Sequence, residues 1–155
     1  MRPLRVFVDT SVFGGLFDPE FDADTRTFFD AVDAGRYKIA ISDQVYQEII
    51  PAPPDVRNFF YTYLPEIDLL KDSLEIQRLT DLYLRDAIVT PKYRADASYV
   101  AYATVHSCAG LVSWNFTHIV HEGKSRLFNV ANASQGYPAL FIADPKEILN
   151  HGQKG

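Results

Sequence analysis

Four oxygen-bearing side chains, three of them acidic, stand near the ends of apolar stretches that lie far apart in the sequence. They are Asp9, Glu48, Asp96 and Asn115. If the apolar stretches form parallel strands, their carboxyl ends meet at one sheet edge, where open α/β sheets bind ligands. Carboxylates held close together repel one another, and a hard ion such as Mg²⁺ or Mn²⁺ prefers their oxygen atoms. Such an ion polarises a phosphodiester and activates water for hydrolysis.

Each of the four side chains also has a purely structural interpretation. Asp9 fits a turn after a strand, although the end of a buried α/β strand favours a functional role. Taken alone, Glu48 is better explained as a solvated surface charge. Asp96 near a helix start is stabilised by the helix dipole without any metal. Asn115 fits a turn as well as it fits a ligand.

Hydroxyl and basic residues flank these four positions and suggest contacts with phosphate. Thr10 and Ser11 could position water or phosphate, although hydroxyls after a strand are also common turn formers. Lys92 and Arg94 precede Asp96 and could hold a phosphate backbone, or simply form a solvated surface.

Other reactive or aromatic residues give weaker signals. His118 and His121 have helical spacing, but no cysteine or third histidine is near, so we expect a surface or phosphate contact rather than zinc. Cys108 is expected to be a small core residue. The aromatic run 58–63 could stack bases, but such a run is more often core or a protein–protein contact, and a partner or dimer surface is the favoured interpretation.

The pattern of apolar stretches and turn residues predicts alternating strands and helices. This alternation is typical of an α/β three-layer sandwich with a central, mostly parallel sheet. We expect one domain over residues 1–155, with its core between about residues 4 and 149. The predicted strands are Leu4–Val8, Tyr37–Ile41, Leu111–Trp114 and Leu140–Ala143.

Helix starts and stops are predicted from capping residues. Asp24 is expected to begin a helix that Gly35 closes, and Gly14-Gly15 is expected to loosen the chain before it. Helices are also predicted around residues 45–50, 73–88 and 96–109, with Ser42 or Asp43 capping the first and Gly110 ending the last. Pro51-Ala52-Pro53-Pro54 is expected to be a loop, and 64–70 could be extended or helical. Asp144 is expected to cap a final short helix.

Composition excludes several classes of protein. The chain has 155 residues, of which 47% are hydrophobic and 23% charged, so disorder throughout is excluded. The formal net charge of −5 argues against a strongly basic nucleic-acid-binding surface. One cysteine excludes an internal disulfide. Asp9 interrupts the first apolar run, and no apolar stretch approaches about 20 residues, so we expect a soluble, cytoplasmic protein without a membrane partner.

Five segments together resemble the ordered motifs of the PIN-domain family, and the resemblance extends from Leu4 to Leu149. It implies a Mg²⁺- or Mn²⁺-dependent ribonuclease acting on RNA. It also implies a toxin of the type II toxin–antitoxin kind (VapC type), usually a homodimer with a small antitoxin protein as partner. By position, the resemblance makes Asp9, Glu48 and Asp96 the metal ligands. The segments are Val8–Val12, Glu48, Asp96-Ala97, Leu111–Phe116 and Ile142–Leu149.

Asn115 departs from this family pattern, because it stands where members commonly have a fourth aspartate. An asparagine offers an oxygen without charge, so the site carries −3 instead of −4, and we expect weaker metal binding with one ion rather than two. A module that binds RNA or a protein without cleaving is therefore an alternative.

Two further classes of enzyme fit less well. An aspartate-based phosphotransferase or phosphatase would usually need a second acidic residue where Ser11 stands. A dinucleotide-binding domain would need a glycine fingerprint that Gly14-Gly15 does not provide.

Overall fold

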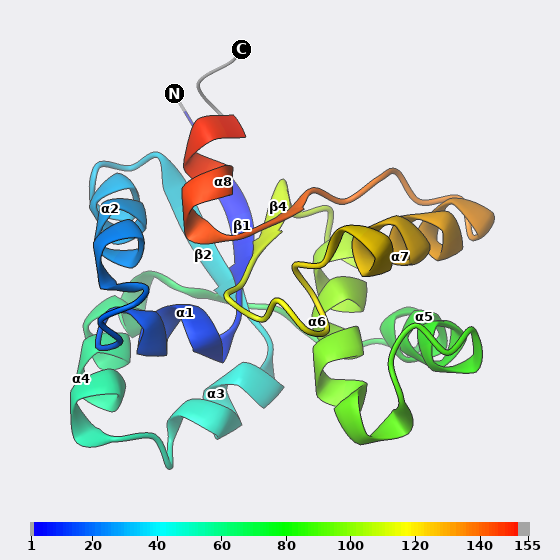
Figure 1. The fold of residues 1–155 in the computed structure, drawn as a ribbon, viewed down its shortest axis with the longest axis horizontal. Coiled ribbons are helices and arrows are strands. Elements are labelled where there is room, and N and C mark those ends of the chain that lie inside the picture. The colour runs from blue at the N-terminus through cyan, green and yellow to red at the C-terminus, as the bar shows by residue number, and fades with distance from the viewer. Residues whose placement is uncertain (1, 152–155) are drawn as a thin grey trace.

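The computed structural model describes residues 2–151, and its centre is a sheet of five parallel strands (Figure 1). The order across the sheet is β3-β2-β1-β4-β5. The chain therefore starts in the middle of the sheet, adds strands on one side, and then crosses to the other side. The strands are β1 Leu4–Val8, β2 Tyr37–Ile41, β3 Asp68–Leu69, β4 Gly110–Val112 and β5 Ile142–Ala143.

The central strand β1 is held between β2 and β4. Val6 is in register with Ile39 on one side and Gly110 on the other. Val6, Phe7 and Val8 are fully buried, as expected for a central strand of a sheet that is covered on both faces. The predicted α/β architecture with a parallel sheet is confirmed.

Helices cover both faces of the sheet. On one face α2 contacts β2 and α8, and α8 contacts β4 and β5. On the other face α6 contacts β1 and β4, and α5 packs against α6. Figure 1 shows α2 and α5 on opposite sides of the strands. The α-helices are α1 Thr10–Gly15, α2 Asp22–Asp33, α3 Asp43–Ile49, α4 Pro54–Tyr63, α5 Leu74–Arg85, α6 Arg94–Val105, α7 Glu122–Ser134 and α8 Pro145–His151.

Several predicted helix boundaries are wrong. Gly14 and Gly15 do not loosen the chain but belong to α1, because Asp9 and Thr10 start a helix directly after β1. Asp24 lies inside the first turn of α2, which starts at Asp22, instead of capping it. Gly110 does not end α6 but opens β4, since α6 already ends at Val105.

Other predictions hold in part. Ser42 has the cap position of α3, yet its buried hydroxyl has no hydrogen-bond partner within residues 2–151. Pro54 leaves the predicted loop and starts α4, because proline is tolerated in a first helical turn. Segment 64–70 contains both a 3₁₀ turn and the short strand β3. Gly35, with φ of 81°, follows the end of α2 as predicted, and Asp144 Oδ1 accepts the backbone N–H groups of Lys146 and Glu147 at the start of α8.

The aromatic run 58–63 packs in part against the core, and its role as a partner or dimer surface stays a prediction. Phe60 is 1% exposed, and its ring packs edge-on against Phe13 at 5.1 Å between centroids. Phe59 packs against Phe29 in the same manner. Only Tyr61 of these aromatic side chains is among the exposed large hydrophobics.

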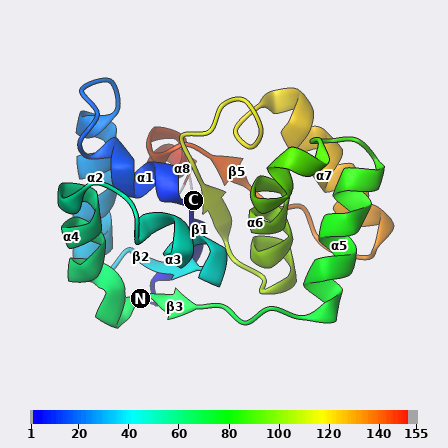
Figure 2. The same cartoon turned by 90° about the horizontal axis from the view of Figure 1, so that it is seen from below.

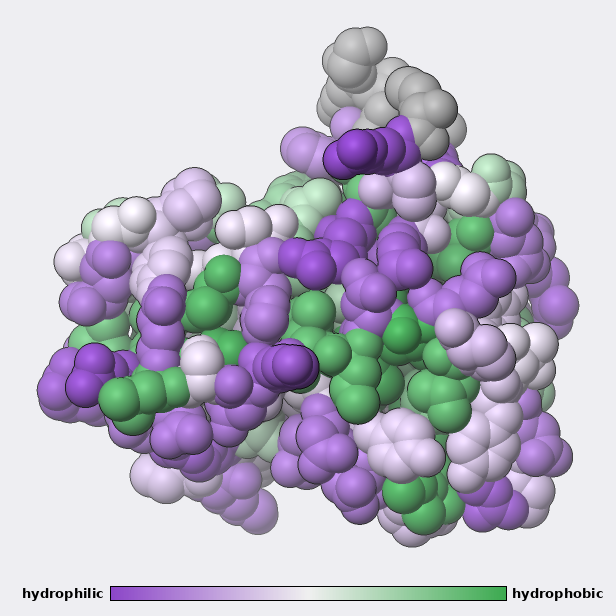
Figure 3. All heavy atoms as spheres, turned by 180° about the vertical axis from the view of Figure 1, so that it is seen from behind, coloured by the Kyte–Doolittle hydropathy of each residue, from purple (hydrophilic) through white to green (hydrophobic). Residues whose placement is uncertain are grey.

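Hydrophobic residues are not spread evenly over the surface. In the view from behind they gather around the middle of the face, with hydrophilic residues around them (Figure 3). Within residues 2–151, no helix combines the length and the apolar character needed to cross a bilayer.

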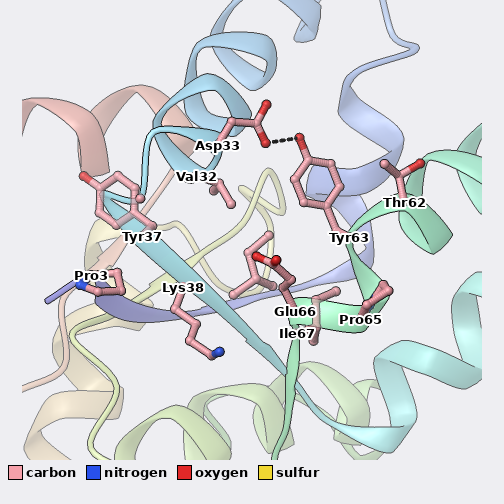
Figure 4. Close-up of a pocket in the computed structure, with 12 residues that line it drawn as sticks. Pro3, Val32, Asp33, Tyr37, Lys38, Thr62, Tyr63, Pro65, Glu66 and Ile67 are labelled. Atoms are coloured by element: carbon pink, nitrogen blue, oxygen red, sulfur yellow. Dashed lines mark hydrogen bonds between the residues drawn. The ribbon is translucent and has the colours of Figure 1, made fainter.

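A pocket of about 640 Å³ lies beside the first residues of β1 and β2 (Figure 4). Pro3, Tyr37 and Lys38 line it, and the hydroxyl of Tyr63 donates to Asp33 Oδ1 across its rim at 2.9 Å. Because these residues mark the amino ends of the strands, the pocket lies away from the carboxyl ends. None of the four candidate site residues lines it.

Candidate acidic site

Asp9 is the most buried member of the candidate site. It follows β1 directly and occupies the cap position of α1, and only 4% of the residue is exposed. Ser11 Oγ donates to Oδ1 at 2.6 Å, and Ser113 Oγ donates to Oδ2 at 2.7 Å. Both carboxylate oxygens therefore accept hydrogen bonds from hydroxyl groups. One hydroxyl comes from the first turn of α1 and the other from the residue directly after β4.

Burial raises the pKa of Asp9 to about 6. The two serine hydroxyls act in the opposite direction, while the negative charges of Asp96 and Glu48 raise the pKa further. Asp9, Glu48 and Asp96 are thus neighbours in the electrostatic sense. Their predicted role as a joint metal site stays a prediction.

Glu48 is held by groups from three elements. It lies on α3, and Thr10 Oγ1 at the start of α1 donates to its Oε2 at 2.9 Å. The Tyr99 hydroxyl from α6 donates to Oε1, and Gln44 Nε2 donates to the same atom at 3.4 Å. Burial, followed by the bond to Glu48, raises the pKa of Tyr99, so its phenol remains a proton donor. Glu48 is thus oriented toward α1 and α6 and is not a free surface charge.

Asp96 sits in the first turn of α6 and receives two donors on one oxygen. Asn115 Nδ2 reaches Asp96 Oδ2 at 3.3 Å, and His118 Nδ1 reaches the same atom at 3.0 Å. Burial raises the pKa of Asp96, while its contacts with His118 and Asn115 lower it. Asn115 Oδ1 meanwhile accepts the backbone N–H groups of Thr117 and His118, so this side chain both shapes the turn and contacts the acid.

The position of His118 corrects the sequence interpretation. His118 lies in a turn and His121 caps α7, so the two do not share a helical face. The His118 ring packs against Tyr93, with centroids 3.8 Å apart, and its side chain is 17% exposed. Contact with Asp96 therefore replaces the expected surface role.

Viewed from below, α1, α3 and α6 are arranged around the end of the central strands (Figure 2). Thr10 starts α1, Glu48 lies on α3 and Asp96 lies on α6, so each helix contributes one polar group. A parallel sheet brings these helices together because each follows or precedes a strand that ends at the same edge.

Negative charge in the site is not balanced by lysine or arginine. Within residues 2–151, Asp96 lies at salt-bridge distance from His118, and Asp9 and Glu48 have no salt-bridge partner. Uncompensated, partly buried carboxylates suit a divalent cation in charge and in donor chemistry. However, no three acidic, histidine or cysteine side chains of this part of the chain are grouped as a ready metal site. Binding an ion would require the carboxylates to move closer together.

The basic residues predicted to contact phosphate lie in different surroundings. Arg94 Nη1 pairs with Asp81 at 2.7 Å on the α5 side, and both side chains are substantially exposed. Lys92 lies over the Tyr93 ring, with Nζ 5.6 Å from its centroid. Within residues 2–151, neither side chain has a salt bridge to Asp9, Glu48 or Asp96.

Sequence reasoning missed Ser113, Tyr99 and His118 as parts of this network. Ser113 had a usable signal, since it is a polar residue in an otherwise apolar strand sequence. Tyr99 and His118 had none, because their partners lie 51 and 22 residues away. Ser11, by contrast, serves the site as a donor to Asp9 and as an acceptor for the Trp114 backbone N–H at 2.9 Å.

Cys108 behaves as predicted. It is buried, and burial raises the pKa of its thiol to about 11. The thiol is therefore a poor nucleophile at neutral pH and takes no part in the site.

Comparison with solved structures identifies the fold. A toxin–antitoxin complex from Klebsiella pneumoniae contains a chain with a TM-score of 0.56 and 18% identity, covering 73% of this chain and 88% of that one. VapBC2 from Rickettsia felis, solved with a DNA fragment from its promoter, gives a TM-score of 0.56 at 13% identity, covering 91% and 98%. The fold is thus of the PIN-domain, VapC type. No family model matches the sequence, and no curated protein sequence is significantly similar.

Proposed function

We propose that the protein is a metal-dependent ribonuclease whose site is formed by Asp9, Glu48 and Asp96. The observation that carries this proposal is that three carboxylates from three elements lie near enough for their charges to act on one another, with no lysine or arginine paired to them within residues 2–151. If these residues served only stability, we would expect basic side chains to pair with the carboxylates, since unpaired buried charges are costly. The PIN-type fold supports the same conclusion by analogy.

The residues of the chain have separate tasks in this proposal. Asp9, Glu48 and Asp96 would hold Mg²⁺ or Mn²⁺, and the bound ion would polarise the phosphodiester and activate water. Ser11 and Ser113 fix the Asp9 carboxylate, which keeps the innermost ligand in place when charged.

Glu48 is the candidate to accept a proton from the attacking water. Thr10 and Tyr99 hold the two oxygens of this side chain, so its position is defined before substrate binds. Lys92, near the Tyr93 ring, is the candidate contact to the RNA backbone, whereas Arg94 would first have to leave Asp81.

The direct test is cleavage of labelled single-stranded and structured RNA with Mg²⁺, Mn²⁺ or EDTA. Asp9→Asn and Asp96→Asn should each abolish cleavage, while Asp30→Asn, at an exposed position on α2, should leave it unchanged. Glu48→Gln should also inactivate the protein, and its control is Glu122→Gln on the exposed side of α7. Full activity of Asp9→Asn would refute the assignment of the site.

The proposed biological role is that of the toxin of a type II toxin–antitoxin pair, acting as a homodimer with a small antitoxin protein. The two solved complexes support an antitoxin partner, because both are toxin–antitoxin assemblies. Growth arrest on expression, relieved by the product of a short neighbouring gene, would support this role. Light scattering of the purified protein tests the homodimer.

A second candidate is a PIN-fold module that binds RNA or a protein without cleaving it. It is favoured by Asn115, which holds Asp96 and the following turn in place of a fourth acid, and by the lack of a preformed group of three metal ligands within residues 2–151. Metal-independent RNA binding with no cleavage under any condition would favour this candidate over the first.

A further inference from the structure

Asp96 differs from the other two carboxylates in how its oxygens are used. Both of its donors, Asn115 Nδ2 and His118 Nδ1, converge on Oδ2. No group within residues 2–151 donates to its Oδ1. Asp9 and Glu48, in contrast, each accept hydrogen bonds on both oxygens. Asp96 therefore keeps one oxygen that needs no exchange of partner before it can bind a cation.

His118 is itself held rigidly. Its ring packs on Tyr93 at 3.8 Å between centroids, and its backbone N–H donates to Asn115 Oδ1 at 2.9 Å. The side chains of His118 and Asp96 are only 17% and 20% exposed, so the bond between them is shielded from competing water. The ring nitrogen that meets Asp96 is thus fixed from two directions.

We propose that His118 is a positioning residue for the divalent cation: by donating to Oδ2 of Asp96, it orients this carboxylate and leaves Oδ1 as the ligating oxygen. This inference rests on the proposed metal-dependent function. Hydrogen bonds to ligating carboxylates commonly orient them, and losing such a partner typically costs about 10- to 100-fold in metal affinity or activity.

The same arrangement would let Asp96 bind a cation without a fourth acid beside it. Asn115 and His118 supply two donors where an additional carboxylate would supply repulsion. In this proposal, the better orientation of Asp96 compensates for part of the metal affinity that is lost because Asn115 carries no charge. In this proposal, Oδ1 of Asp96 is the oxygen toward which the other carboxylates would move when an ion binds.

Three variants separate the donor from the ring. His118→Phe keeps an aromatic ring against Tyr93 but removes the donor, whereas His118→Asn keeps an amide N–H near the place of Nδ1. His121→Asn, in the same loop, is the control, because His121 contacts Lys124 and not Asp96. Asp96→Asn removes the negative charge of the proposed ligand. The circular dichroism melting curve of each variant reports whether it is folded.

Binding of Mn²⁺ alone is measured by the loss of the electron paramagnetic resonance signal of the free ion. We expect His118→Phe to bind Mn²⁺ about 10- to 100-fold more weakly than the unmodified protein, and His118→Asn to remain within about threefold. His121→Asn should match the unmodified protein, and Asp96→Asn should bind most weakly.

Each remaining outcome contradicts the inference in a recognisable way. If a folded His118→Phe binds Mn²⁺ normally while Asp96→Asn does not, the metal site stands and the role of His118 is wrong. If His118→Asn loses as much affinity as His118→Phe, the donor is not what matters, and the inference also fails. If the unmodified protein binds no Mn²⁺, both this inference and the proposed function fall together.

Discussion

Ser113 Oγ donates to Asp9 Oδ2 at 2.7 Å, although the two residues are 104 positions apart. Asp9 follows β1 and Ser113 follows β4, so the bond links the ends of two neighbouring parallel strands. The same hydroxyl accepts the backbone N–H of Asn115 at 2.9 Å. One serine therefore connects the most buried acid to the turn that carries Asn115 and His118.

Replacing this serine should destabilise the fold and disturb the acid. Ser113→Ala removes a donor to a charged, buried group, and we expect a loss of about 1.5–3 kcal/mol in the free energy of unfolding at pH 8. Urea unfolding measures the change. Ser134→Ala is the control, because its hydroxyl donates only to a carbonyl within α7, and it should change stability little. If the two substitutions lower the free energy of unfolding equally, the hydrogen bond to Asp9 contributes no more to stability than an ordinary bond to a carbonyl.

The raised pKa of Asp9 predicts a pH dependence for the metal-free protein. The pKa of Asp9 is about 6 in the folded state, against the ordinary aspartate value of 3.8 that applies to the unfolded chain. The folded state therefore binds this proton more tightly. Stability contributed by Asp9 is therefore highest below pH 4, falls as the pH rises to about 6, and stays low above it. The loss is roughly 3 kcal/mol at about 1.4 kcal/mol per pKa unit.

Urea unfolding in EDTA at several pH values tests this dependence against Asp9→Asn, which has no charge to develop. The difference in unfolding free energy between the two proteins should shift in favour of Asp9→Asn as the pH rises from 4 to 6. A difference that is constant over this range would contradict the prediction.

Two adjacent glycines in α1 should respond oppositely to alanine. A Cβ at Gly15 would lie 2.8 Å from both Thr25 Oγ1 and Trp114 Nε1, two atoms that are hydrogen-bonded to each other at 2.9 Å. Gly15→Ala should therefore cost about 1–3 kcal/mol through overpacking. Nothing lies within 4 Å of a Cβ at Gly14, so Gly14→Ala should stabilise the helix by about 0.5–1 kcal/mol.

Thermal melting of both alanine variants gives the comparison. A change of 1 kcal/mol moves the midpoint by about 2–4 °C for a chain of this size. If Gly15→Ala melts no lower than Gly14→Ala, the close packing of α1 against Trp114 is wrong.

Restoring a fourth acid should exchange stability for metal binding. Asn115→Asp removes the amide donor to Asp96 and puts a like charge beside it, which should lower metal-free stability by at least about 1 kcal/mol. The added charge should also tighten Mn²⁺ binding by roughly tenfold. Melting with EDTA and with Mn²⁺ measures both effects, and Asn58→Asp, at an exposed position on α4, is a control outside the site. An Asn115→Asp protein with unchanged Mn²⁺ affinity would show that charge does not limit the site.

The positions of the main strands could be predicted because their signals are local. Leu4–Val8 and Tyr37–Ile41 are short apolar runs with a polar residue at the end, and the structure has strands at these same bounds. The strand before Asn115 ends at Val112 rather than Trp114, and beyond it the Ser113 side chain bonds with Asp9 and the Trp114 side chain with Thr25 of α2. A local pattern does not contain such contacts.

The chemistry of the site was only partly contained in the sequence. Positions near strand ends and the resemblance to the PIN-domain family selected Asp9, Glu48 and Asp96, and in the structure Asp9 and Asp96 are partly or fully buried acids affected by the charge of Glu48. The contact between His118 and Asp96 depends on how the turn 115–121 folds back on α6, and no periodicity reports it. Their metal-binding and catalytic roles remain predictions for the experiments above.

Trp114 is the single tryptophan of the chain and stands next to Asn115. Its indole stacks on Phe21 at 4.4 Å between centroids and donates to Thr25. The backbone N–H of Trp114 also donates to Ser11 Oγ, the hydroxyl that holds Asp9. The intrinsic fluorescence of this one tryptophan should therefore report rearrangements around Asp9 and Asn115 without any label.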